Sequence, residues 1–387
     1  MKFRKCPSNI NKMKYSRILI IRTDRIGDCI LSTPAVAFLK KLFPSAEIDV
    51  LTTPYTADVF SGNPHIREVI LDDPMKTSVF SGQFMRLIGG IRKRKYEICF
   101  ILHLSLRASV VPFLAGIPTR VAPASKIYQF LANRRIVQKR SHCLMNESEY
   151  NVDLIKKFLG VEGEEPPSSL YFDDASAAFM SDHLNREFLR LRGVSYDEFK
   201  KNGGKMVLVH PGCGGSALNM SIACYAEVME KLYKLGFEIF LSTGPQEAAL
   251  KKELISKLSF MPISYGDDLF KHGRVLSRSF ALISKCDAAL APSTGIMHAA
   301  VALSKPVAAL FCPIFVCMAK RWGPDPHSRA ESVVLTPDVK CSDDANITHE
   351  KYCKRCIKSQ CAYYNCMDGL SSETVVDCVL RIAGRAV

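Results

Sequence analysis

Short apolar segments, each followed by a turn and a helical or polar stretch, recur along most of the chain and limit the folds it can adopt. In the first half they predict strands at Arg17–Ile21, Glu47–Leu51, Val69–Leu71 and Ile98–Leu102. In the second half they predict strands at Met206–Val209, Phe237–Leu241, Ala288–Ala291 and Val307–Phe311. Strands that alternate with helices are typical of βαβ units around a parallel sheet. The alternation therefore predicts an α/β fold.

The length of the chain favours two domains. A sequence of 387 residues is long for a single hydrophobic core. A polar, helix-prone stretch from about 173 to 204 ends in Asn202-Gly203-Gly204, which is typical of a domain boundary. We therefore expect a first domain over residues 15–195 and a second over residues 205–387, with a cysteine-rich segment at 341–378.

The turn after the first predicted strand contains the first candidate for catalysis. It reads Arg22-Thr23-Asp24-Arg25-Ile26-Gly27-Asp28 and leads into a helix that we expect to continue through Lys41. Gly27 permits a sharp turn, and Asp28 lies at or near the start of the helix. Asp28 could be an ordinary N-cap carboxylate, or a general base at the carboxyl end of the strand. Both roles can hold together.

Two turns in the second half combine small residues with a preceding strand. One reads Pro292-Ser293-Thr294-Gly295-Ile296-Met297-His298 and opens a helix, whose N-terminus attracts anions. The other reads His210-Pro211-Gly212-Cys213-Gly214-Gly215-Ser216, where glycines let the backbone approach a ligand closely. Each turn alone is compatible with a plain N-cap or a surface loop. Together they predict one diphosphate site at the carboxyl edge of a parallel sheet.

Two further side chains stand in or beside predicted turns. Glu247 follows the strand Phe237–Leu241 and could bind ribose hydroxyls, or could simply begin a helix. Arg120 is the single cation presented by the turn Gly116-Ile117-Pro118-Thr119-Arg120, and we consider it a candidate for binding an acceptor.

The formal charge of +14 and the isoelectric point near 9.1 indicate an anionic partner. We expect no nucleic acid, because no RNA-binding signature with interleaved aromatic residues is present. The basic run Arg92-Lys93-Arg94-Lys95 could be a solvated face or could touch anionic headgroups. Residues 1–14 lack the apolar core of a signal peptide, and no apolar run of about 18 residues exists to span a bilayer. The sequence predicts a cytosolic protein that can rest peripherally on a membrane.

Six of the fifteen cysteines cluster near the end of the chain, at positions 341, 353, 356, 361, 366 and 378. Four of them, in the pattern Cys353-x2-Cys356-x4-Cys361-x4-Cys366, could bind zinc or iron as thiolates. The pattern lacks a distant second Cys-x2-Cys pair. Reduced thiols in a loop before the last helix explain it equally well.

In their order and spacing, these residues resemble glycosyltransferase family 9, the ADP-heptose:lipopolysaccharide heptosyltransferase family. The resemblance extends from about Arg17 to Ile382. Its marks, in chain order, are Gly27-Asp28 with Thr33-Pro34-Ala35, Gly116 to Arg120, His210-Pro211-Gly212, Gly215-Ser216-Ala217, Gly244-Pro245 with Glu247, Thr294-Gly295 with Met297-His298, and Trp322 with Pro324.

The resemblance implies a GT-B fold, in which two Rossmann-like domains with parallel sheets face each other across a cleft. It implies an inverting, metal-independent transfer of heptose from ADP-heptose to a lipopolysaccharide core or related glycan, with Asp28 as the base. It places Arg120 in the acceptor-binding domain. The positions implied to bind the donor are Gly212, Gly215, Ser216, Glu247, Thr294, Gly295 and His298. Similar cysteines recur in family members, which implies a local structural role for the cluster.

Three departures from the family pattern leave alternatives open. Ser293 stands where the family usually has Asp, Leu218 occupies an often basic position, and Met220-Ser221 replaces Trp-Pro. Loss of a cation beside a diphosphate weakens the case for the usual donor more than the case for the family. The alternatives are a degenerate member that binds a glycan or membrane without catalysis, and a nucleotide-sugar epimerase or hydrolase of the same fold.

Overall fold

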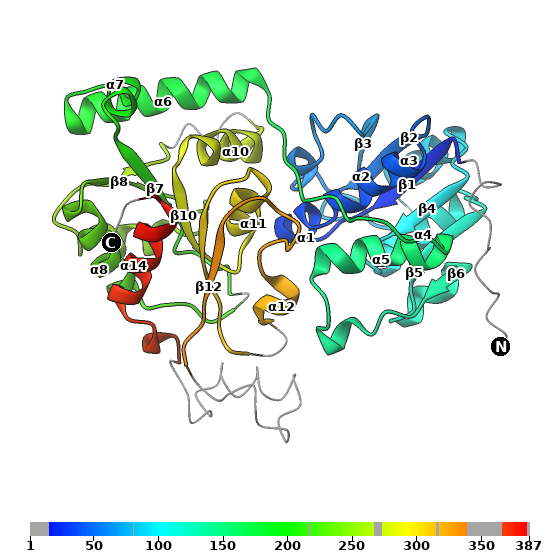
Figure 1. Cartoon of the computed structure of the whole chain (residues 1–387). Helices are drawn as coiled ribbons and strands as arrows, with labels where there is room; N and C mark the ends of the chain where they lie inside the picture. Colours follow the sequence, from blue (N-terminus) through cyan, green and yellow to red (C-terminus); the bar gives the residue numbers. More distant parts are fainter. Residues whose placement is uncertain are drawn as a thin grey trace. The chain divides into compact units, whose positions relative to one another are not determined.

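The computed structural model describes residues 15–79, 81–215, 217–266, 273–314, 317–338 and 366–384. The chain forms two compact units that divide between Tyr171 and Phe172. Each unit is built around its own sheet of six parallel strands (Figure 1). The α/β fold class predicted from the alternation is confirmed.

The sheet of the first unit has the strand order β3-β2-β1-β4-β5-β6. Its strands are β1 (Arg17–Ile21), β2 (Glu47–Thr52), β3 (Glu68–Leu71), β4 (Ile98–Ile101), β5 (Thr119–Pro123) and β6 (Arg134–Ile136). In the central strand β1, Leu19 pairs in register with Asp49 of β2 and with Cys99 of β4. Because all pairs are parallel, the carboxyl ends of the strands meet at one edge.

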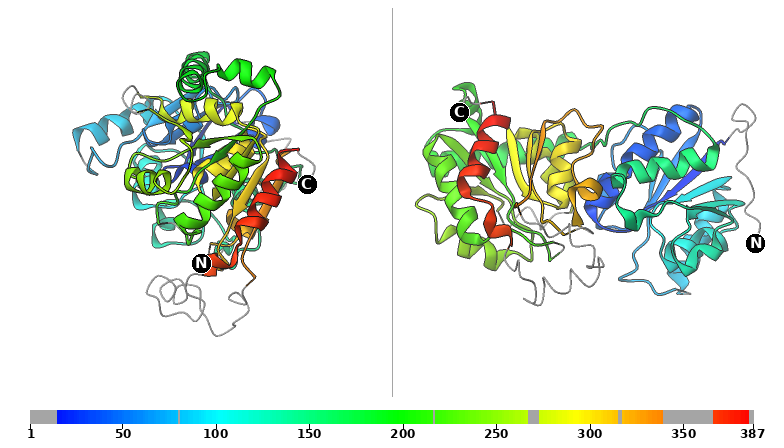
Figure 2. Two further views of the ribbon diagram at one scale, coloured as in Figure 1. Left: turned by 90° about the vertical axis from the view of Figure 1, so that its left-hand side faces the viewer. Right: turned by 60° about the horizontal axis from the view of Figure 1, so that its bottom comes forward.

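Helices cover both faces of this sheet. They are α1 (Ile26–Ile30), α2 (Thr33–Leu42), α3 (Gly82–Lys93), α4 (Leu106–Leu114) and α5 (Glu147–Leu159), with 3-10 turns η2 (Ala57–Val59), η3 (Ile127–Leu131) and η4 (Arg140–His142). Helices α2 and α5 lie side by side on one face (Figure 2). On the other face, α3 and α4 bury apolar side chains against Leu19, Ile21 and Ile101. Each fully buried side chain of this size contributes about 1.5–3 kcal/mol.

The helix expected to run from Asp28 through Lys41 is two helices, so that prediction was wrong. Helix α1 ends at Ile30, and α2 begins at Thr33 with Pro34 in its first turn. Proline is favoured at a helix start and cannot continue a helix, because it has no amide hydrogen and clashes with the preceding turn. The break leaves Asp28 on a short separate helix at the edge of the sheet.

The sheet of the second unit has the strand order β12-β11-β10-β7-β8-β9. Its strands are β7 (Lys205–Val209), β8 (Phe237–Leu241), β9 (Ile263–Ser264), β10 (Ala288–Pro292), β11 (Val307–Leu310) and β12 (Ser332–Leu335). Counted from the first strand of each unit, both sheets have the order 3-2-1-4-5-6 that defines the Rossmann fold. The order reverses between β1 and β4 in the first unit and between β7 and β10 in the second.

Helices again form a layer on each face of the second sheet. They are α6 (Asp174–Arg192), α7 (Tyr196–Lys201), α8 (Ile222–Lys234), α9 (Ala248–Ile255), α10 (Val275–Lys285), α11 (Gly295–Ala302), α12 (Ala319–Trp322) and α14 (Ser372–Ile382), with a 3-10 turn η8 (Cys366–Gly369). The apolar sides of α8 and α14 pack against Val207, Ile239 and Leu290. Helices α10 and α11 pack against each other, and α11 contacts β10 and β11.

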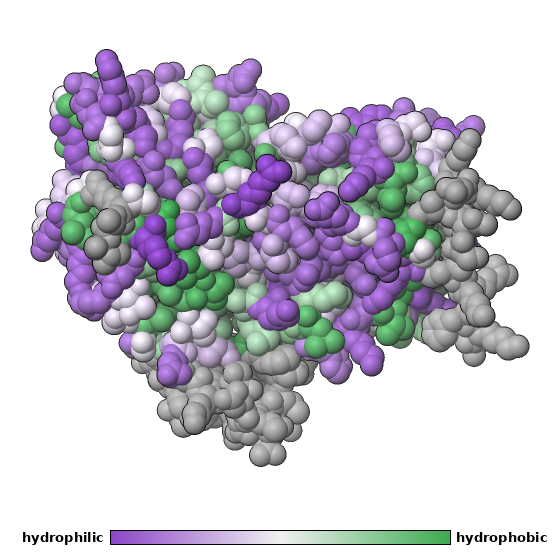
Figure 3. All heavy atoms as spheres, viewed as in Figure 1, coloured by the Kyte–Doolittle hydropathy of each residue, from purple (hydrophilic) through white to green (hydrophobic). Residues whose placement is uncertain are grey.

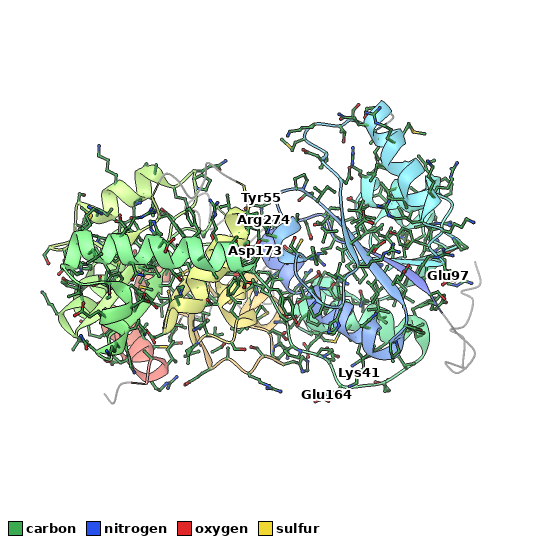
Figure 4. All side chains as sticks on the ribbon, turned by 90° about the horizontal axis from the view of Figure 1, so that it is seen from above. Lys41, Tyr55, Glu97, Glu164, Asp173 and Arg274 are labelled. Carbon is green, nitrogen blue, oxygen red and sulfur yellow. The ribbon has the colours of Figure 1, made fainter. Side chains whose placement is uncertain are left out.

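Helix α6 belongs to the second unit, although residues up to 195 were expected in the first domain. It packs along α10. The Asp173 carboxylate accepts the Ser176 backbone amide at the start of α6 and forms an ion pair with Arg274, the residue before α10 (Figure 4). Hydrophilic side chains gather over α6 and α7 on the face shown in Figure 3. The division therefore falls at the start of the polar helical stretch rather than at its end.

Within the described ranges, no helix is both long enough and apolar enough to span a bilayer.

Candidate active site

In each unit, some of the candidate residues lie where the strand order reverses. Asp28 is on α1, which follows β1, and His103 follows β4. In the second unit, the turn at Gly212 follows β7, and Thr294 follows β10. Open parallel sheets bind ligands at the carboxyl ends of the strands on either side of this reversal. Each unit thus presents one candidate site at its own switch point.

A buried arginine organises the site in the first unit. The Arg22 side chain is only 2% exposed, and its Nη2 donates to Asp28 Oδ1 over 2.6 Å. Its Nε donates to Asp24 Oδ1 over 2.7 Å, and its Nη1 donates to Glu147 Oε1 over 3.3 Å and to Asn151 Oδ1 over 3.2 Å. One guanidinium therefore serves three carboxylates at once.

Two further groups complete this arrangement. Arg140, in η4, donates from Nη1 to Glu147 Oε1 over 2.7 Å. His103 Nδ1 lies 3.0 Å from Asp24 Oδ2, and its side chain is 35% exposed. We call these six charged or titratable groups the Arg22 cluster: Arg22, Asp24, Asp28, His103, Arg140 and Glu147.

The two aspartates of the β1–α1 turn have pKa values shifted in opposite directions. Burial raises the pKa of Asp28 to about 6; Arg22 opposes this rise, while Asp24 and Glu147 add to it. Burial acts to raise the pKa of Asp24 too, but Arg22 and His103 outweigh it and lower that pKa to about 2. Asp28 therefore has a raised pKa despite its ion pair with Arg22, because the cost of burying its charge outweighs that pair. A carboxylate whose pKa approaches neutrality is suited to accept a proton from a substrate.

In the second unit, Glu247 lies directly against the glycine turn, a contact that the sequence did not predict. Glu247 is the residue before α9, and its Oε2 accepts the Gly244 amide over 2.7 Å. A Cβ atom built on Gly212 would overlap the Glu247 carboxylate. Only glycine at 212 leaves room for this carboxylate against the turn. His210, the first residue of the glycine turn, is buried, and its Nδ1 lies 2.9 Å from the Ser242 carbonyl oxygen. Burial lowers the pKa of His210.

The rest of the glycine turn is open. Gly214 and Gly215 have φ values of +54° and +69°, and the space where a Cβ would stand is empty at both. These dihedrals favour glycine. Ser216, which was predicted to bind the donor, lies outside the described residues. Leu218 packs partly buried against the core, so this position supplies no charge to the turn.

The helix that follows β10 begins without a side-chain cap. Thr294 precedes α11 in extended conformation, and its hydroxyl donates to the Pro292 carbonyl oxygen over 3.2 Å instead of capping the helix. The first intrahelical bond runs from the His298 amide to the Thr294 carbonyl. The amides of the first turn, beginning with Gly295, therefore have no acceptor within the helix. Such amides suit an anion.

His298 is on α11 but is buried, with 5% of its surface exposed. Burial lowers its pKa to about 4, although Asp325 acts in the opposite direction. Its Nδ1 has no hydrogen-bond partner among the described residues. The side chain is thus held neutral beneath the turn, which fits a role in supporting the loop; direct contact with a donor stays a prediction.

Arg120 lies in β5, and its guanidinium binds backbone. Its Nε donates to the Leu131 carbonyl over 2.8 Å and its Nη1 donates to the Ile117 carbonyl over 2.6 Å. The guanidinium carbon also lies 5.5 Å from the centre of the Phe113 ring. These contacts join β5 to its flanking turns, and acceptor binding by Arg120 stays a prediction.

Of the predicted metal ligands, the described residues include only Cys366. It is buried at the start of η8 and belongs to the core of the second unit. Cys353, Cys356 and Cys361 lie outside the described residues. In the described ranges, no group of three or more His, Cys, Asp or Glu side chains is arranged to hold a metal ion.

Of the six members of the Arg22 cluster, only Asp28 was predicted as a site residue. Arg22 and Asp24 stand in the same turn as Asp28, so their proximity could have been inferred. His103 could have been found from its place after β4, the strand across the reversal from β1. No sequence signal marks Glu147 and Arg140, because their place depends on how α5 and η4 pack.

Comparisons with known proteins agree with this architecture. The profile of glycosyltransferase family 9 (heptosyltransferase) matches residues 84–354. A relative from Haemophilus influenzae, named as a glycosyltransferase, is 29% identical over 318 residues that cover 80% of this chain and 86% of the relative.

Two solved structures have the same fold. Escherichia coli ADP-heptose lipopolysaccharide heptosyltransferase II superposes with a TM-score of 0.71 at 18% identity, covering 96% of this chain and 98% of the other. A dodecameric iron-containing heptosyltransferase, TibC, in complex with ADP-D-β-D-heptose, superposes with a TM-score of 0.54 at 13% identity. The superposition covers 96% of this chain and 78% of TibC. The fold is therefore of the GT-B type. The profile match spans most of the chain, so the protein belongs to glycosyltransferase family 9, the heptosyltransferase family, and is a glycosyltransferase.

Proposed function

We propose that this glycosyltransferase moves heptose from ADP-heptose to a sugar hydroxyl of a lipopolysaccharide core. Family membership supports the reaction class, and the names of the two structural neighbours support ADP-heptose as donor. The observation that carries the proposal is Asp28, a carboxylate with a pKa of about 6 at the switch point of the first sheet. The sugar and nucleotide of the donor and the identity of the acceptor are part of the proposal.

In the proposed reaction, Asp28 accepts the proton of the acceptor hydroxyl as that oxygen bonds to the anomeric carbon of the donor. The bond from that carbon to the nucleoside diphosphate breaks, and the configuration at the carbon inverts. Arg22 holds the Asp28 carboxylate through Nη2, which leaves its second oxygen for the hydroxyl. General base catalysis of this kind contributes about 10²–10⁴-fold to the rate.

The second unit would bind the diphosphate through backbone groups. The amides at the start of α11 and of the Gly212–Gly215 turn are candidates to stabilise the charge that grows on the leaving phosphate. Glu247, held by the Gly244 amide, would accept hydrogen bonds from the ribose hydroxyls.

The donor can be tested without knowledge of the acceptor. A ligand that binds the folded protein raises its melting temperature by mass action. We expect ADP-heptose to raise it more than ADP-glucose or UDP-glucose at equal concentration. Product analysis with truncated lipopolysaccharide cores then separates transfer from hydrolysis. Hydrolysis or epimerisation of the donor at equal rates with and without acceptor would contradict the proposal.

We propose in addition that the protein rests on an anionic membrane surface. Arg92, Lys93 and Lys95 are exposed at the end of α3, and each cation near such a surface contributes about 1 kcal/mol. Binding to vesicles with 30% anionic lipid should fall as salt rises and should weaken in the pair Lys93→Glu and Lys95→Glu. The pair Lys252→Glu and Lys257→Glu, with the same change in charge, is the control. Equal vesicle binding by the two double variants would contradict the proposal that this surface contacts the membrane.

A metal site at Cys353, Cys356, Cys361 and Cys366 is a further proposal. Thiolates suit zinc and iron, and the structural neighbour TibC contains iron. Metal analysis of protein purified without chelators should find one zinc or iron per chain. Less than a stoichiometric amount, together with four titratable thiols in this segment, would remove the proposal.

A further inference from the structure

The Arg22 cluster has an unequal count of opposite charges. It contains three carboxylates and two guanidinium groups, joined by the contacts described above. The Arg22 and Glu147 side chains are each only 2% exposed, and a buried excess charge is unfavourable. If all three carboxylates are ionised, the five groups carry one net negative charge. One proton in the cluster would balance it.

His103 is the sixth group, and its imidazole carries a charge only when it is protonated. Its Nδ1 lies 3.0 Å from Asp24 Oδ2, while the other oxygen of the same carboxylate accepts a hydrogen bond from Arg22 Nε. Arg22 then donates from Nη2 to Asp28. A continuous chain of charged contacts therefore connects His103 to Asp28.

Other groups that face Asp28 do not supply the missing charge. Burial raises the pKa of the Cys29 thiol on α1 to about 12, so the thiol stays neutral. Asn151 on α5 is uncharged. Arg25, the residue before α1, is exposed to solvent. Within the Arg22 cluster, the loop after β4 contributes His103, α5 contributes Glu147 and η4 contributes Arg140.

We propose that His103 is a positioning residue for Asp28: a charged imidazole holds the Asp28 carboxyl ionised, and a neutral imidazole leaves Asp28 its proton. The two groups share one proton through Asp24 and Arg22. The coupling itself does not depend on the proposed function; only its effect on catalysis rests on that function. The effects of the neighbours on Asp28 agree with this proposal, since His103 lowers the pKa of Asp28 while Asp24 and Glu147 raise it.

Coupling between two titrating groups is reciprocal, so it can be measured from His103 without any substrate. The ring signals of the nine histidines would be followed by NMR through a pH titration of the full chain. The His103 signal is identified by its loss in His103→Gln. In Asp28→Asn, the midpoint of His103 should fall by about 0.5–1 pH unit, because the imidazolium loses a negative neighbour.

His65 provides the control within the same spectra. It precedes β3, at the amino end of the sheet opposite to Asp28, and its midpoint should not move. A His103 midpoint that changes by less than 0.1 unit, or by as much as that of His65, would overturn the proposal.

A second variant tests the same coupling through activity. His103 is partly exposed, so His103→Gln should fold, and glutamine can still donate to Asp24. The acid limb of kcat/KM for heptosyl transfer should move to higher pH by about 0.5–1 unit, because Asp28 loses a positive neighbour. An unshifted limb would contradict the proposal. Absence of transfer in the parent protein would contradict the proposed function alone, because the NMR result does not depend on activity.

Discussion

The two switch points have the same strand order but opposite chemistry. Between β1 and β4, side chains dominate: one buried guanidinium contacts three carboxylates. Between β7 and β10, backbone dominates: glycines with left-handed dihedrals and an uncapped helix start present amides. A Rossmann-like sheet thus fixes where a site is, while the residues of the first turn after the strand decide what it can bind.

This difference predicts that the two sites respond differently to substitution. A site made of ionised side chains can lose its chemistry through a change of one atom. A site made of backbone amides is insensitive to most side chains and sensitive to any added volume.

The largest effect is expected for Asp28→Asn. The change keeps the size of the side chain and its hydrogen-bonding capacity but removes the base, so transfer should fall by about 10²–10⁴-fold. Donor binding should be retained, because the donor turns lie in the other unit. Transfer kinetics and donor titration of the folded variant are the measurements. Activity near that of the parent would mean that Asp28 serves only as a helix-start residue.

A smaller effect is expected for Gly212→Ala, which adds one methyl group to the backbone site. The new Cβ overlaps the Glu247 carboxylate, so donor affinity should fall by about tenfold or more, equivalent to about 1.4 kcal/mol. In a Glu247→Ala background the same substitution should cost little. The double-mutant cycle, measured by donor titration, isolates this coupling. Equal losses in both backgrounds would place the effect of the methyl group elsewhere.

The pH dependence of the free energy of unfolding should reveal the cost of burying the ionised Asp28 carboxylate. Folding raises the pKa of Asp28 from its ordinary value near 4 to about 6. The folded chain therefore binds this proton more tightly than the unfolded chain, and the free energy of unfolding decreases as pH rises from about 4 to about 6. Asp28→Asn removes this loss.

The variant should accordingly be more stable than the parent by about 1–3 kcal/mol at pH 7.5, with the gain vanishing near pH 4. Urea unfolding at both pH values measures this. Glu253→Gln, which changes an exposed carboxylate of α9, is the control and should show no such gain. A loss of stability at pH 7.5 would mean that the Asp28–Arg22 ion pair outweighs the cost of burial.

The smallest effect on catalysis is expected for Arg120→Gln. The guanidinium binds two backbone carbonyls, so its loss should lower stability by about 1–3 kcal/mol and change acceptor KM by less than about threefold. Thermal unfolding and acceptor kinetics measure the two effects. A large rise in acceptor KM at unchanged stability would restore Arg120 as an acceptor contact.

Patterns in the sequence were sufficient to predict the central strands of both sheets, because those strands are continuous apolar runs. They also predicted the edge strand β3, but they did not predict β5, β6, β9 and β12. Arg134–Ile136 contains two arginines, and Ile263–Ser264 has two residues, too few to show a pattern. Strands β6 and β12 contain no buried residue, so their composition carries less information.

The candidate sites likewise contain features that the sequence predicts and features that it does not predict. Glycine turns are visible in a sequence because their backbone geometry requires glycine, and Glu247 could be placed because it follows a predicted strand. Two members of the Arg22 cluster, Glu147 and Arg140, could not be found in this way. Glu147 lies 125 positions from Arg22 along the chain, and only the packing of α5 against the sheet brings them together.

The division between Tyr171 and Phe172 has a consequence for how such proteins diversify. Each half of the chain carries a complete sheet with helices on both faces, so an exchange of genetic material at this point would transfer an intact hydrophobic core. Under the proposed function, a single crossover between two family genes would join the acceptor preference of one parent to the donor preference of the other. New pairings of sugar and acceptor could therefore be inherited in one step, without a series of point substitutions.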